Sequence, residues 1–279
     1  MKVISLINMK GGVGKTTVAT NIAHFIAEKL NKKVLVIDVD PQFNATQCLM
    51  NDSSYVEHMK CNKDTVLSIF DNDYKLIVSA VDGASQQNKK NLEDIETVTI
   101  SKNLHLLPGN LNLFQLEMAS GEGKEYRLKN FIKSKEKDFD FVIIDTPPTP
   151  SVWMASALIA SDYYLITVKP EPLSMTGIDL LNAIVEQKKT NYSLSITCIG
   201  IVLNLVEENT KVFKDASKYL SEGWRKNLLF NKFIPKRTKI AREQTSNKFI
   251  LDLDDNDSKL AIAGIVNELM DRINEKKSK

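Results

Sequence analysis

The chain has 279 residues, enough for one large hydrophobic core, and its 43% apolar and 26% charged residues are ordinary for a globular protein. A formal net charge of +2 gives the whole molecule no strong attraction for polyanions, so any nucleic-acid site depends on local clustering. The cysteines form no C-x-x-C pair, which argues against an iron–sulfur site, and no apolar run approaches the roughly 18 residues of a membrane span, so we expect a soluble cytoplasmic protein.

Apolar runs of strand length alternate with longer segments of helical periodicity. This alternation is typical of a doubly wound α/β fold, in which helices cover both faces of a mostly parallel sheet. The predicted strands are 2–8, 33–38, 103–107, 140–145, 163–168 and 196–204. The predicted helices are 15–30, 110–120, 124–136, 151–160, 174–189, 209–226 and 258–275. Right-handed crossovers would bring the carboxyl ends of the strands to one edge, where such folds bind ligands.

Residues 51–100 show the weakest pattern in the chain. Their polar stretches indicate loops around a short helix at 64–70. We interpret this region as a less regular insertion on a single domain of residues 1–279.

The first predicted strand runs directly into the glycine-rich stretch KGGVGKTT. Its end, Gly14-Lys15-Thr16, keeps the phosphate-loop pattern and opens a predicted helix. Glycine lets backbone N–H groups converge on phosphate oxygens, and the helix amino terminus adds partial positive charge. We expect Lys15 to reach the β- and γ-phosphates of ATP and the Thr16 hydroxyl to hold Mg²⁺. The predicted nucleotide-binding residues of the loop are Lys10, Gly11, Gly12, Val13, Gly14, Lys15, Thr16 and Thr17.

Three aspartates lie at predicted strand ends. Asp38 and Asp40 follow the buried run VLVI, and Asp145 ends the run FVII. Because Asp38 and Asp40 alternate along the strand end, one can lie near Mg²⁺ and the other toward an attacking water. Mg²⁺ prefers oxygen ligands, so Thr16, Asp145 and one of these two aspartates are the predicted metal residues.

The phosphate loop departs from the strict pattern, since Met9 stands where glycine is expected and Lys10 adds a second cation. This KGGVGKT form resembles the deviant phosphate loop of the ParA/MinD ATPases. DPQFNAT is similar to the family's DPQGNAT, with Phe43 in place of glycine. Further similar stretches, LHLLPGNLNLFQLE, KPEPLSMTGIDLL, IGIVLNLV and IPKRTKIAREQ, extend the resemblance over nearly the whole chain. The sequence resembles the short, Soj-like form most, because no helix-turn-helix precedes the loop.

The resemblance implies roles for individual residues. Lys10 would cross a dimer interface to the partner's nucleotide, where a second cation offsets charge developing between the β- and γ-phosphates. Asp40 would orient or deprotonate the hydrolytic water, so the implied catalytic residues are Lys10, Lys15 and Asp40. Asp38 would then belong to the metal shell, so the implied metal residues are Thr16, Asp38 and Asp145. Asn204 would read the adenine edge, with Pro235 packed nearby.

The resemblance also implies a function: ATP-dependent plasmid or chromosome partition. The ATP-bound homodimer would bind DNA non-specifically, and a centromere-binding, ParB-like adaptor would stimulate a weak intrinsic ATPase. Such a protein is expected to be cytoplasmic and nucleoid-associated.

A local excess of positive charge supports a DNA partner. Residues 207–248 hold eleven Lys or Arg against five acidic residues, a net charge of +6. Phosphate neutralisation by such a region is independent of sequence and sensitive to salt. The alternative is a solvated basic face balanced by the acidic run at 251–257. The candidate DNA-binding residues are Lys211, Lys214 and Lys218 on one helix face, and Lys236, Arg237, Lys239 and Arg242 around a loop and short helix.

Two other functions remain open. A MinD-like or other cargo-positioning ATPase would act on membranes or protein assemblies. Membrane-binding relatives end in an additional basic amphipathic helix, whereas the last helix here has apolar residues spaced to cover a sheet, so no membrane partner is expected. A different class is an ATP-dependent transferase or ligase that acts on a small molecule with the same scaffold.

Overall fold

The strands form the centre of the molecule. The computed structural model describes residues 1–70, 90–118, 123–171 and 174–277. In this part of the chain, seven strands form one sheet in the order β3-β4-β2-β5-β1-β6-β7. All neighbours are parallel except β3 and β4. The strands are β1 (Lys2–Ile7), β2 (Val34–Asp38), β3 (Val98–Thr99), β4 (Leu104–Leu107), β5 (Phe141–Asp145), β6 (Tyr163–Val168) and β7 (Thr197–Leu203). The predicted doubly wound α/β fold is confirmed.

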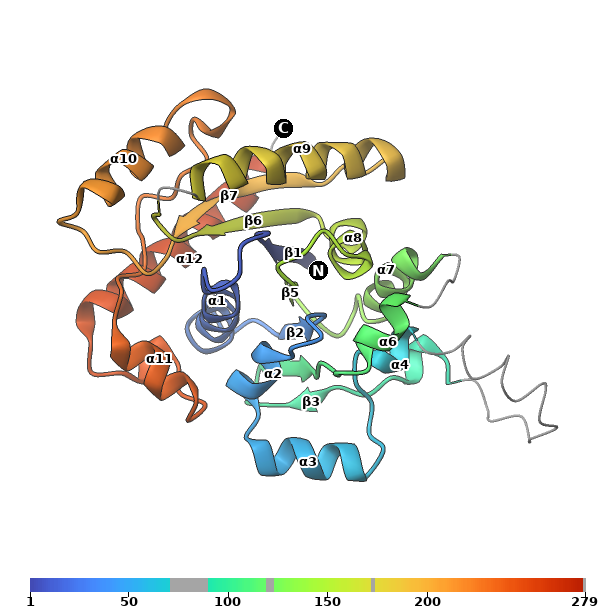
Figure 1. The fold of residues 1–279 in the computed structure, drawn as a ribbon. Coiled ribbons are helices and arrows are strands. Elements are labelled where there is room, and N and C mark those ends of the chain that lie inside the picture. The colour runs from blue at the N-terminus through green and yellow to red at the C-terminus, as the bar shows by residue number, and fades with distance from the viewer. Residues whose placement is uncertain (71–89, 119–122, 172–173, 278–279) are drawn as a thin grey trace.

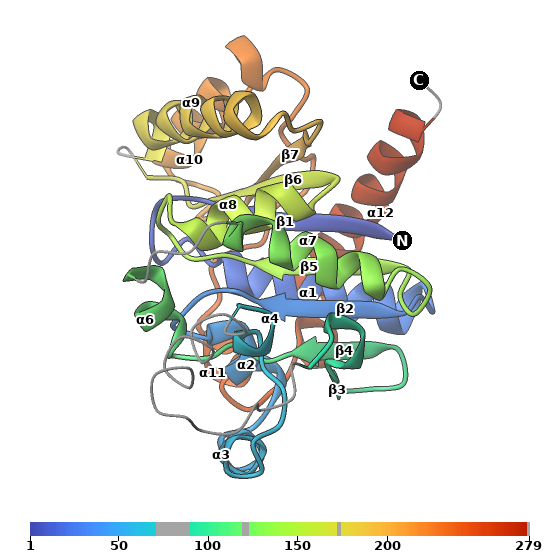
Figure 2. The ribbon, with the colours of Figure 1, turned by 90° about the vertical axis from the view of Figure 1, so that its right-hand side faces the viewer.

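Helices cover both faces of this sheet (Figures 1 and 2). On one face lie α1 (Lys15–Lys29) and α12 (Asn256–Lys277), and on the other α7 (Lys124–Ser134), α8 (Val152–Ala160) and α9 (Ser174–Tyr192). The remaining helices are α2 (Asn44–Leu49), α3 (Asp52–Lys60), α4 (Leu67–Phe70), α6 (Leu113–Met118), α10 (Lys211–Leu220) and α11 (Thr238–Gln244). Short 3₁₀ turns are η1 (Leu92–Asp94), η2 (Gly223–Arg225) and η3 (Ile250–Asp252).

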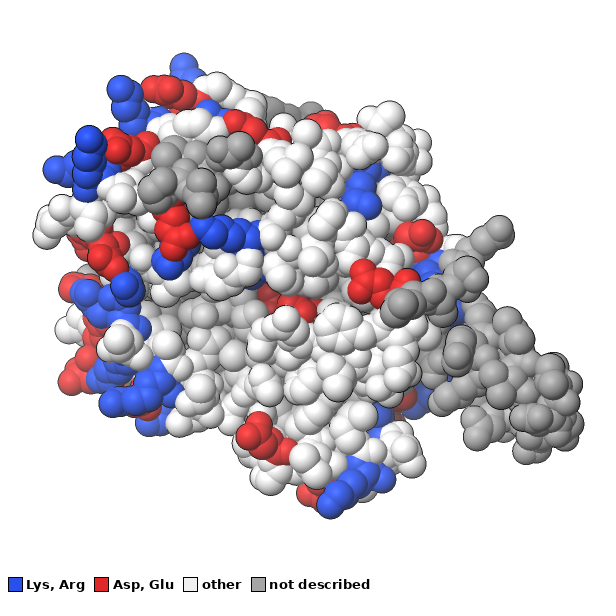
Figure 3. All heavy atoms as spheres, viewed as in Figure 1, with Lys and Arg blue, Asp and Glu red and all other residues white. Residues whose placement is uncertain are grey.

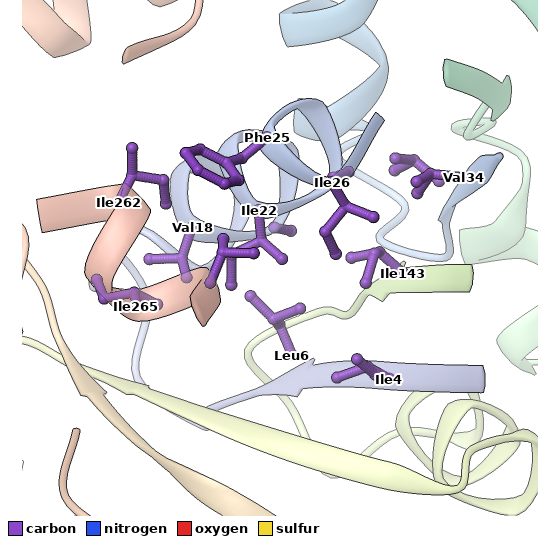
Figure 4. Close-up of a cluster of buried hydrophobic side chains, with 14 of the residues drawn as sticks. Ile4, Leu6, Val18, Ile22, Phe25, Ile26, Val34, Ile143, Ile262 and Ile265 are labelled. Atoms are coloured by element: carbon purple, nitrogen blue, oxygen red, sulfur yellow. The ribbon is translucent and has the colours of Figure 1, made fainter. Parts of the chain in front are cut away.

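Helix α1 is buried along most of its length. Figure 4 shows Val18 and Ile22 directed toward Leu6 of β1, with Ile262 and Ile265 of α12 beside them. All five side chains are buried completely. Because full burial of one such side chain stabilises a fold by about 1.5–3 kcal/mol, this contact holds α1 firmly against the sheet. The amino terminus of α1 is therefore a fixed point at the carboxyl edge.

Several predicted boundaries differ from the structure. The helix predicted at 209–226 spans Lys211–Leu220, because Glu222 takes an extended backbone and leads the chain into η2. The strand predicted at 2–8 ends at Ile7, where Asn8 turns away to donate its side-chain amide to the Thr167 carbonyl. The helix predicted at 110–120 spans Leu113–Met118, and residues 119–120 lie outside the described part.

The region from 51 to 100 contains regular elements that the sequence did not indicate. Residues read as a polar loop form α3, which Asn51 caps by accepting a hydrogen bond from the Ser54 backbone N–H at 2.8 Å. The edge strand β3 pairs antiparallel with β4 over two residues. Residues 71–89 of the predicted insertion lie outside the described part.

Candidate nucleotide-binding site

The phosphate loop joins β1 to α1 at the carboxyl edge of the sheet. Gly12 and Gly14 have φ values of 71° and 79°, the left-handed region that favours glycine. A Cβ on Gly14 would lie 2.1 Å from Nδ2 of Asn204, whereas a Cβ on Gly11 or Gly12 would meet no atom within 4 Å. The loop is thus packed against Asn204 on one side and borders open space on the other. This open side is where a phosphate group has room.

Lys15 and Thr16 begin α1 next to this open side. Lys15 is only 7% exposed, and burial lowers the pKa of its ammonium group, against the attraction of Asp145 and Asp40. The Thr16 hydroxyl donates to Oδ2 of Asp145 at 2.6 Å. The predicted loop lysine and hydroxyl therefore both lie near the acidic strand ends.

Asp145 has one carboxylate oxygen without a partner. Its Oδ1 is buried and accepts no hydrogen bond from any described residue. Burial raises the pKa of Asp145 to about 6, against the Thr16 hydrogen bond and the charge of Lys15. An unpartnered buried carboxylate oxygen and a neighbouring threonine hydroxyl are two oxygen ligands that suit Mg²⁺. The residues present therefore fit the predicted metal.

Asp38 lies opposite Asp145 in the pairing of β2 with β5. Its Oδ2 accepts hydrogen bonds from the backbone N–H and the hydroxyl of Thr46, each at 2.8 Å. Burial and the nearby charge of Asp145 raise the pKa of Asp38 well above its usual range. Because Thr46 occupies this oxygen, Asp38 suits an indirect contact with a metal, through water.

Asp40 lies beyond the end of β2, with 6% of its surface exposed. Its Oδ1 accepts the backbone N–H of Gln42 at 2.9 Å. Burial raises its pKa, against this hydrogen bond and the attraction of Lys15. Asp40 and Asp145 thus act on the buried ammonium group of Lys15, and Asp38 interacts with both of these carboxylates. The three carboxylates outnumber this lysine, and a divalent cation would neutralise the excess of negative charge.

No described group of three His, Cys, Asp or Glu side chains is placed to hold a metal ion by itself. Mg²⁺ commonly binds one or two carboxylates and completes its shell with waters and substrate phosphates. A magnesium ion at Thr16 and Asp145 would therefore depend on a bound nucleotide for its remaining ligands.

Sequence reasoning missed the residues that hold the acidic loop in place. The Thr46 hydroxyl donates to Asp38 and accepts the backbone N–H of Gly109 at 2.7 Å. A Cβ on Gly109 would lie 2.6 Å from Cβ of Phe43, so glycine is required there. Phe43, which replaces the family's glycine, still takes a left-handed φ of 45° and stacks on Tyr55. The stacked rings, with centroids 5.2 Å apart, compensate for the backbone strain.

Comparison with known proteins agrees with this geometry. A family model described as an AAA domain matches residues 1–196. The chain belongs to the AAA domain family. It is 29% identical to the sporulation initiation inhibitor protein Soj of Bacillus subtilis, over 90% of each chain. The resemblance to ParA/MinD ATPases of the Soj-like form is confirmed.

Solved structures show the same fold for this AAA domain. A plasmid partition protein of Borrelia burgdorferi bound to AMPPNP superimposes with a TM-score of 0.73 at 24% identity, covering 99% of both chains. Cobyrinic acid a,c-diamide synthase from Mycobacterium smegmatis, with a bound ATP analogue and magnesium, gives a TM-score of 0.66 at 23% identity. That match covers 88% of this chain and 92% of the synthase. The fold is therefore common to a partition protein and a synthase.

Lys10 of this AAA domain lies away from the buried carboxylates. Its ammonium group pairs with Glu171, which also pairs with Lys169. These two lysines hold the pKa of Glu171 low, at about 2. The Lys10 backbone N–H donates to the side chain of Asn8 at 2.9 Å, which fixes the start of the loop. The side chain is 38% exposed, so it lies at the surface of the nucleotide edge.

Asn204, Pro235 and Thr17 have neighbours that the sequence did not indicate. Asn204 is fully buried and donates to the Val13 carbonyl at 2.9 Å, while its Oδ1 has no described hydrogen-bond partner. Pro235 is buried and forms an isolated parallel β-bridge with Val206. The Thr17 hydroxyl donates to Oε1 of Gln244 at 2.9 Å. Asn204 is therefore next to the loop, and Thr17 also contacts α11.

The candidate DNA-binding residues fall into two groups. Lys211, Lys214 and Lys218 are exposed on α10, and no ion pair engages them within the described part of the chain. By contrast, Lys236 pairs with Glu207, Arg237 with Asp255 and Asp257, and Arg242 with Glu243. The Lys239 ammonium group donates to the Asp254 carbonyl at 3.4 Å. Among the described helices, none is long and apolar enough to cross a bilayer.

Proposed function

We propose that this chain is an ATP-dependent switch of the ParA/Soj type that partitions a plasmid or chromosome. The observation that carries the proposal is the buried Lys15 at an open glycine loop, beside the unpartnered Oδ1 of Asp145. Phosphate oxygens and a divalent cation complement this arrangement of charge. Similarity to Soj supports the biological role.

In this proposal the residues divide the work of ATP hydrolysis. Lys15 and the loop N–H groups bind the β- and γ-phosphates, while Thr16 and Asp145 hold Mg²⁺, with Asp38 as an indirect ligand through water. The metal supplies charge neutralisation on the phosphate oxygens. Asp40 orients the hydrolytic water, and its raised pKa makes its carboxylate a stronger base toward that water. Asn204 offers its free Oδ1 to the adenine amino group, with Pro235 nearby.

The proposed homodimer brings two nucleotide edges together. Figure 3 shows that the centre of this face carries few charged side chains. At the same edge, Leu111, which precedes α6, and Phe114, within α6, are 56% and 48% exposed. Protein interfaces have few charged residues and many aromatic ones at their core, so this face suits a second copy of the chain. Lys10 would then leave Glu171 and reach the partner's nucleotide.

The proposed DNA-binding surface is centred on α10. Asp179 of α9 accepts hydrogen bonds from Tyr219, Trp224 and Arg225, which fixes α10 with its lysine row outward. In Figure 3, Lys and Arg gather along the left margin over α10 and α11, mixed with acidic side chains. Because ion pairs occupy Lys236, Arg237 and Arg242, the α10 lysines are the more available contacts for phosphates. A centromere-binding, ParB-like adaptor would stimulate hydrolysis and release the DNA.

The synthase with the same fold favours a second candidate, an ATP-dependent transferase or ligase. Such an enzyme would consume ATP in proportion to a small-molecule product. A DNA-riding switch hydrolyses ATP slowly without any co-substrate. The same distinction separates the switch from a MinD-like positioner, which would bind lipid or a protein assembly but not DNA.

The deciding experiment is binding of Asp40→Ala to a random-sequence duplex with ATP, ADP or no nucleotide, at two salt concentrations. Asp40→Ala should bind ATP but hydrolyse it poorly, so the ATP-bound dimer should accumulate. We expect DNA binding with ATP alone, and a steep loss of affinity as salt rises.

The control is Lys15→Ala, which should bind neither nucleotide nor DNA, because the buried ammonium group that faces the phosphates is gone. Retained ATP binding by Lys15→Ala would refute the nucleotide site. If Asp40→Ala binds ATP without binding DNA in any state, the DNA partner is wrong and the lipid or protein-cargo function takes its place.

A further inference from the structure

The nucleotide loop and the basic helix α11 meet at one side chain, Gln244. Its Oε1 accepts the Thr17 hydroxyl at 2.9 Å, and its Nε2 lies 2.8 Å from Sγ of Cys48. Thr17 is in the first turn of α1, and Cys48 is in α2, which follows the Asp38–Asp40 loop. One amide therefore contacts both helices that carry the proposed nucleotide site.

Other contacts attach the segment after α11 to the same two helices. Asn247 donates its side-chain amide to the Gln47 carbonyl of α2 at 2.8 Å. The backbone N–H of Ile250 donates to Asn21 of α1 at 2.6 Å. Neither contact involves a side chain of the phosphate loop. The Gln244 contact differs from these two, because the Thr17 hydroxyl lies at the amino terminus of α1, where a phosphate would bind.

The chemistry of a hydroxyl makes this contact sensitive to a nucleotide. Thr17 has a single hydroxyl proton, and in this structure it donates that proton to Gln244. A phosphate oxygen at the amino terminus of α1 is a stronger, charged acceptor for the same proton. When the Thr17 hydroxyl donates its hydrogen bond to the phosphate, Oε1 of Gln244 loses its donor.

We infer that Gln244 is a positioning residue that couples nucleotide occupancy to the placement of α11 and its basic residues. Without nucleotide, Thr17 holds Gln244 and α11 is docked on α1 and α2. With nucleotide, Thr17 donates to the phosphate instead, and α11 is released, which frees Lys239 from the Asp254 carbonyl to meet a polyanion. The coupling to DNA rests on the proposed function, whereas the release of α11 does not.

The primary test follows hydrogen exchange of residues 238–250 with and without AMPPNP. Wild-type protein should exchange faster with AMPPNP, by about fivefold if one hydrogen bond of about 1 kcal/mol is lost. Gln244→Met keeps the length of the side chain but lacks the amide. Its nucleotide-free exchange should match that of AMPPNP-bound wild type and should not respond further. Retained AMPPNP affinity shows that this variant is folded.

The matched control is Asn247→Gly, which removes the contact with Gln47 and tolerates the φ of 55° at that position. Its segment should exchange faster in both states yet keep the response to AMPPNP. The inference is overturned if wild type shows no response, if Gln244→Met retains it, or if both variants lose it equally. The last outcome would mean that residues 238–250 are held in place by several equivalent contacts and that Gln244 has no specific role in the response to AMPPNP.

A second readout connects this coupling to DNA. Without nucleotide, Gln244→Met should bind random duplex about fivefold more tightly than wild type does. The ratio of its DNA affinities with and without nucleotide should therefore be smaller than that of wild type. A loss of DNA binding in every state would contradict the inference. If wild type binds no DNA at all, the proposed function fails, and hydrogen exchange alone then decides the role of Gln244.

Discussion

The proposed function requires Lys10 to exchange one contact for another. In the single chain it pairs with Glu171 at the surface, and an exposed ion pair of this kind contributes only about 0–1 kcal/mol. Little free energy therefore opposes its transfer to a partner's nucleotide. The pair holds the lysine close to the edge where a second chain would dock.

Replacing Lys10 by alanine separates nucleotide binding from the proposed action in trans. Lys10→Ala should bind ATP within about threefold of wild type, because Lys15 and the loop N–H groups remain. Dimerisation or hydrolysis should fall at least tenfold, as expected for loss of a charge-stabilising cation. Sedimentation and phosphate release measure the two effects. Unchanged assembly and turnover would exclude Lys10 from the mechanism.

We expect His24 to make the free energy of unfolding dependent on pH. Its ring stacks on Phe249 with centroids 3.8 Å apart, and Nδ1 is buried without a described partner. Burial lowers the pKa of His24, against the attraction of Asp252 and Glu28. The unfolded chain therefore binds a proton more readily than the folded one, so stability is lost as pH falls below about 6.5.

We expect His24→Phe to reduce this loss while keeping the ring stack. Urea unfolding of both proteins at pH 7.5 and pH 5.5 gives the comparison. The free energy of unfolding should fall less for the variant between these pH values. Burial also lowers the pKa of His105, so the difference between the two proteins is the meaningful quantity. Equal losses would show that His24 does not contribute.

At the scale of elements, Thr46 connects α2, β2 and the turn after β4. Its hydroxyl serves Asp38 and the Gly109 N–H together, and the residue is completely buried. Thr46→Val should destabilise the protein by about 1–3 kcal/mol, since the Gly109 N–H is left unpaired. Denaturant unfolding measures this loss.

Thr20→Val provides the matched control. The Thr20 hydroxyl is also buried, but it donates to the Thr16 carbonyl within its own helix at 2.8 Å. Its removal leaves that carbonyl with its helical partner, so the loss should stay below about 1 kcal/mol. Equal losses for the two variants would refute the specific role of Thr46.

The elements that were predicted from sequence are those with long apolar patterns. The six parallel strands were located to within one residue at each end, because each is a buried run. The two-residue β3 and the polar α3 carry too little pattern to be recognised. For the candidate site, local motifs predicted Lys15, Thr16 and the aspartates, which the fold brings to one edge of the sheet.

Thr46, Asn8 and Gln244 were missed because their roles depend on contacts between distant segments. Thr46 is 63 residues from Gly109, Asn8 is 159 from Thr167, and Gln244 is 227 from Thr17. No spacing within the sequence indicates that such residues meet. Only the assembled sheet brings them together at one edge.

For the whole molecule, the distribution of charge predicts α10 as the DNA-binding surface of the proposed switch. The lysine row of α10 lies on the margin of the face shown in Figure 3, far along the sheet from α7. The double variant Lys211→Glu, Lys218→Glu should weaken ATP-dependent DNA binding at least tenfold. The dependence of log affinity on log salt should also become shallower by about two per protomer.

The matched control reverses two exposed lysines on α7, in the variant Lys129→Glu, Lys133→Glu. It changes the net charge equally, but far along the sheet from α10. Its DNA affinity should fall by less than about threefold, because only the effect of the lower net charge on DNA binding remains. Equal effects of the two double variants would mean that DNA binding does not involve α10.

The strand order has a consequence for biosynthesis. β1 is made first, yet both its neighbours come much later, since Lys2 opposes Phe141 and Ile4 opposes Tyr163. A nascent chain that stops before β6 leaves β1 without one of its two partners. Closing such distant pairs is slow, and the unpaired apolar strand is prone to aggregate meanwhile. The nucleotide loop therefore acquires its shape only late in translation, after most of the chain has left the ribosome.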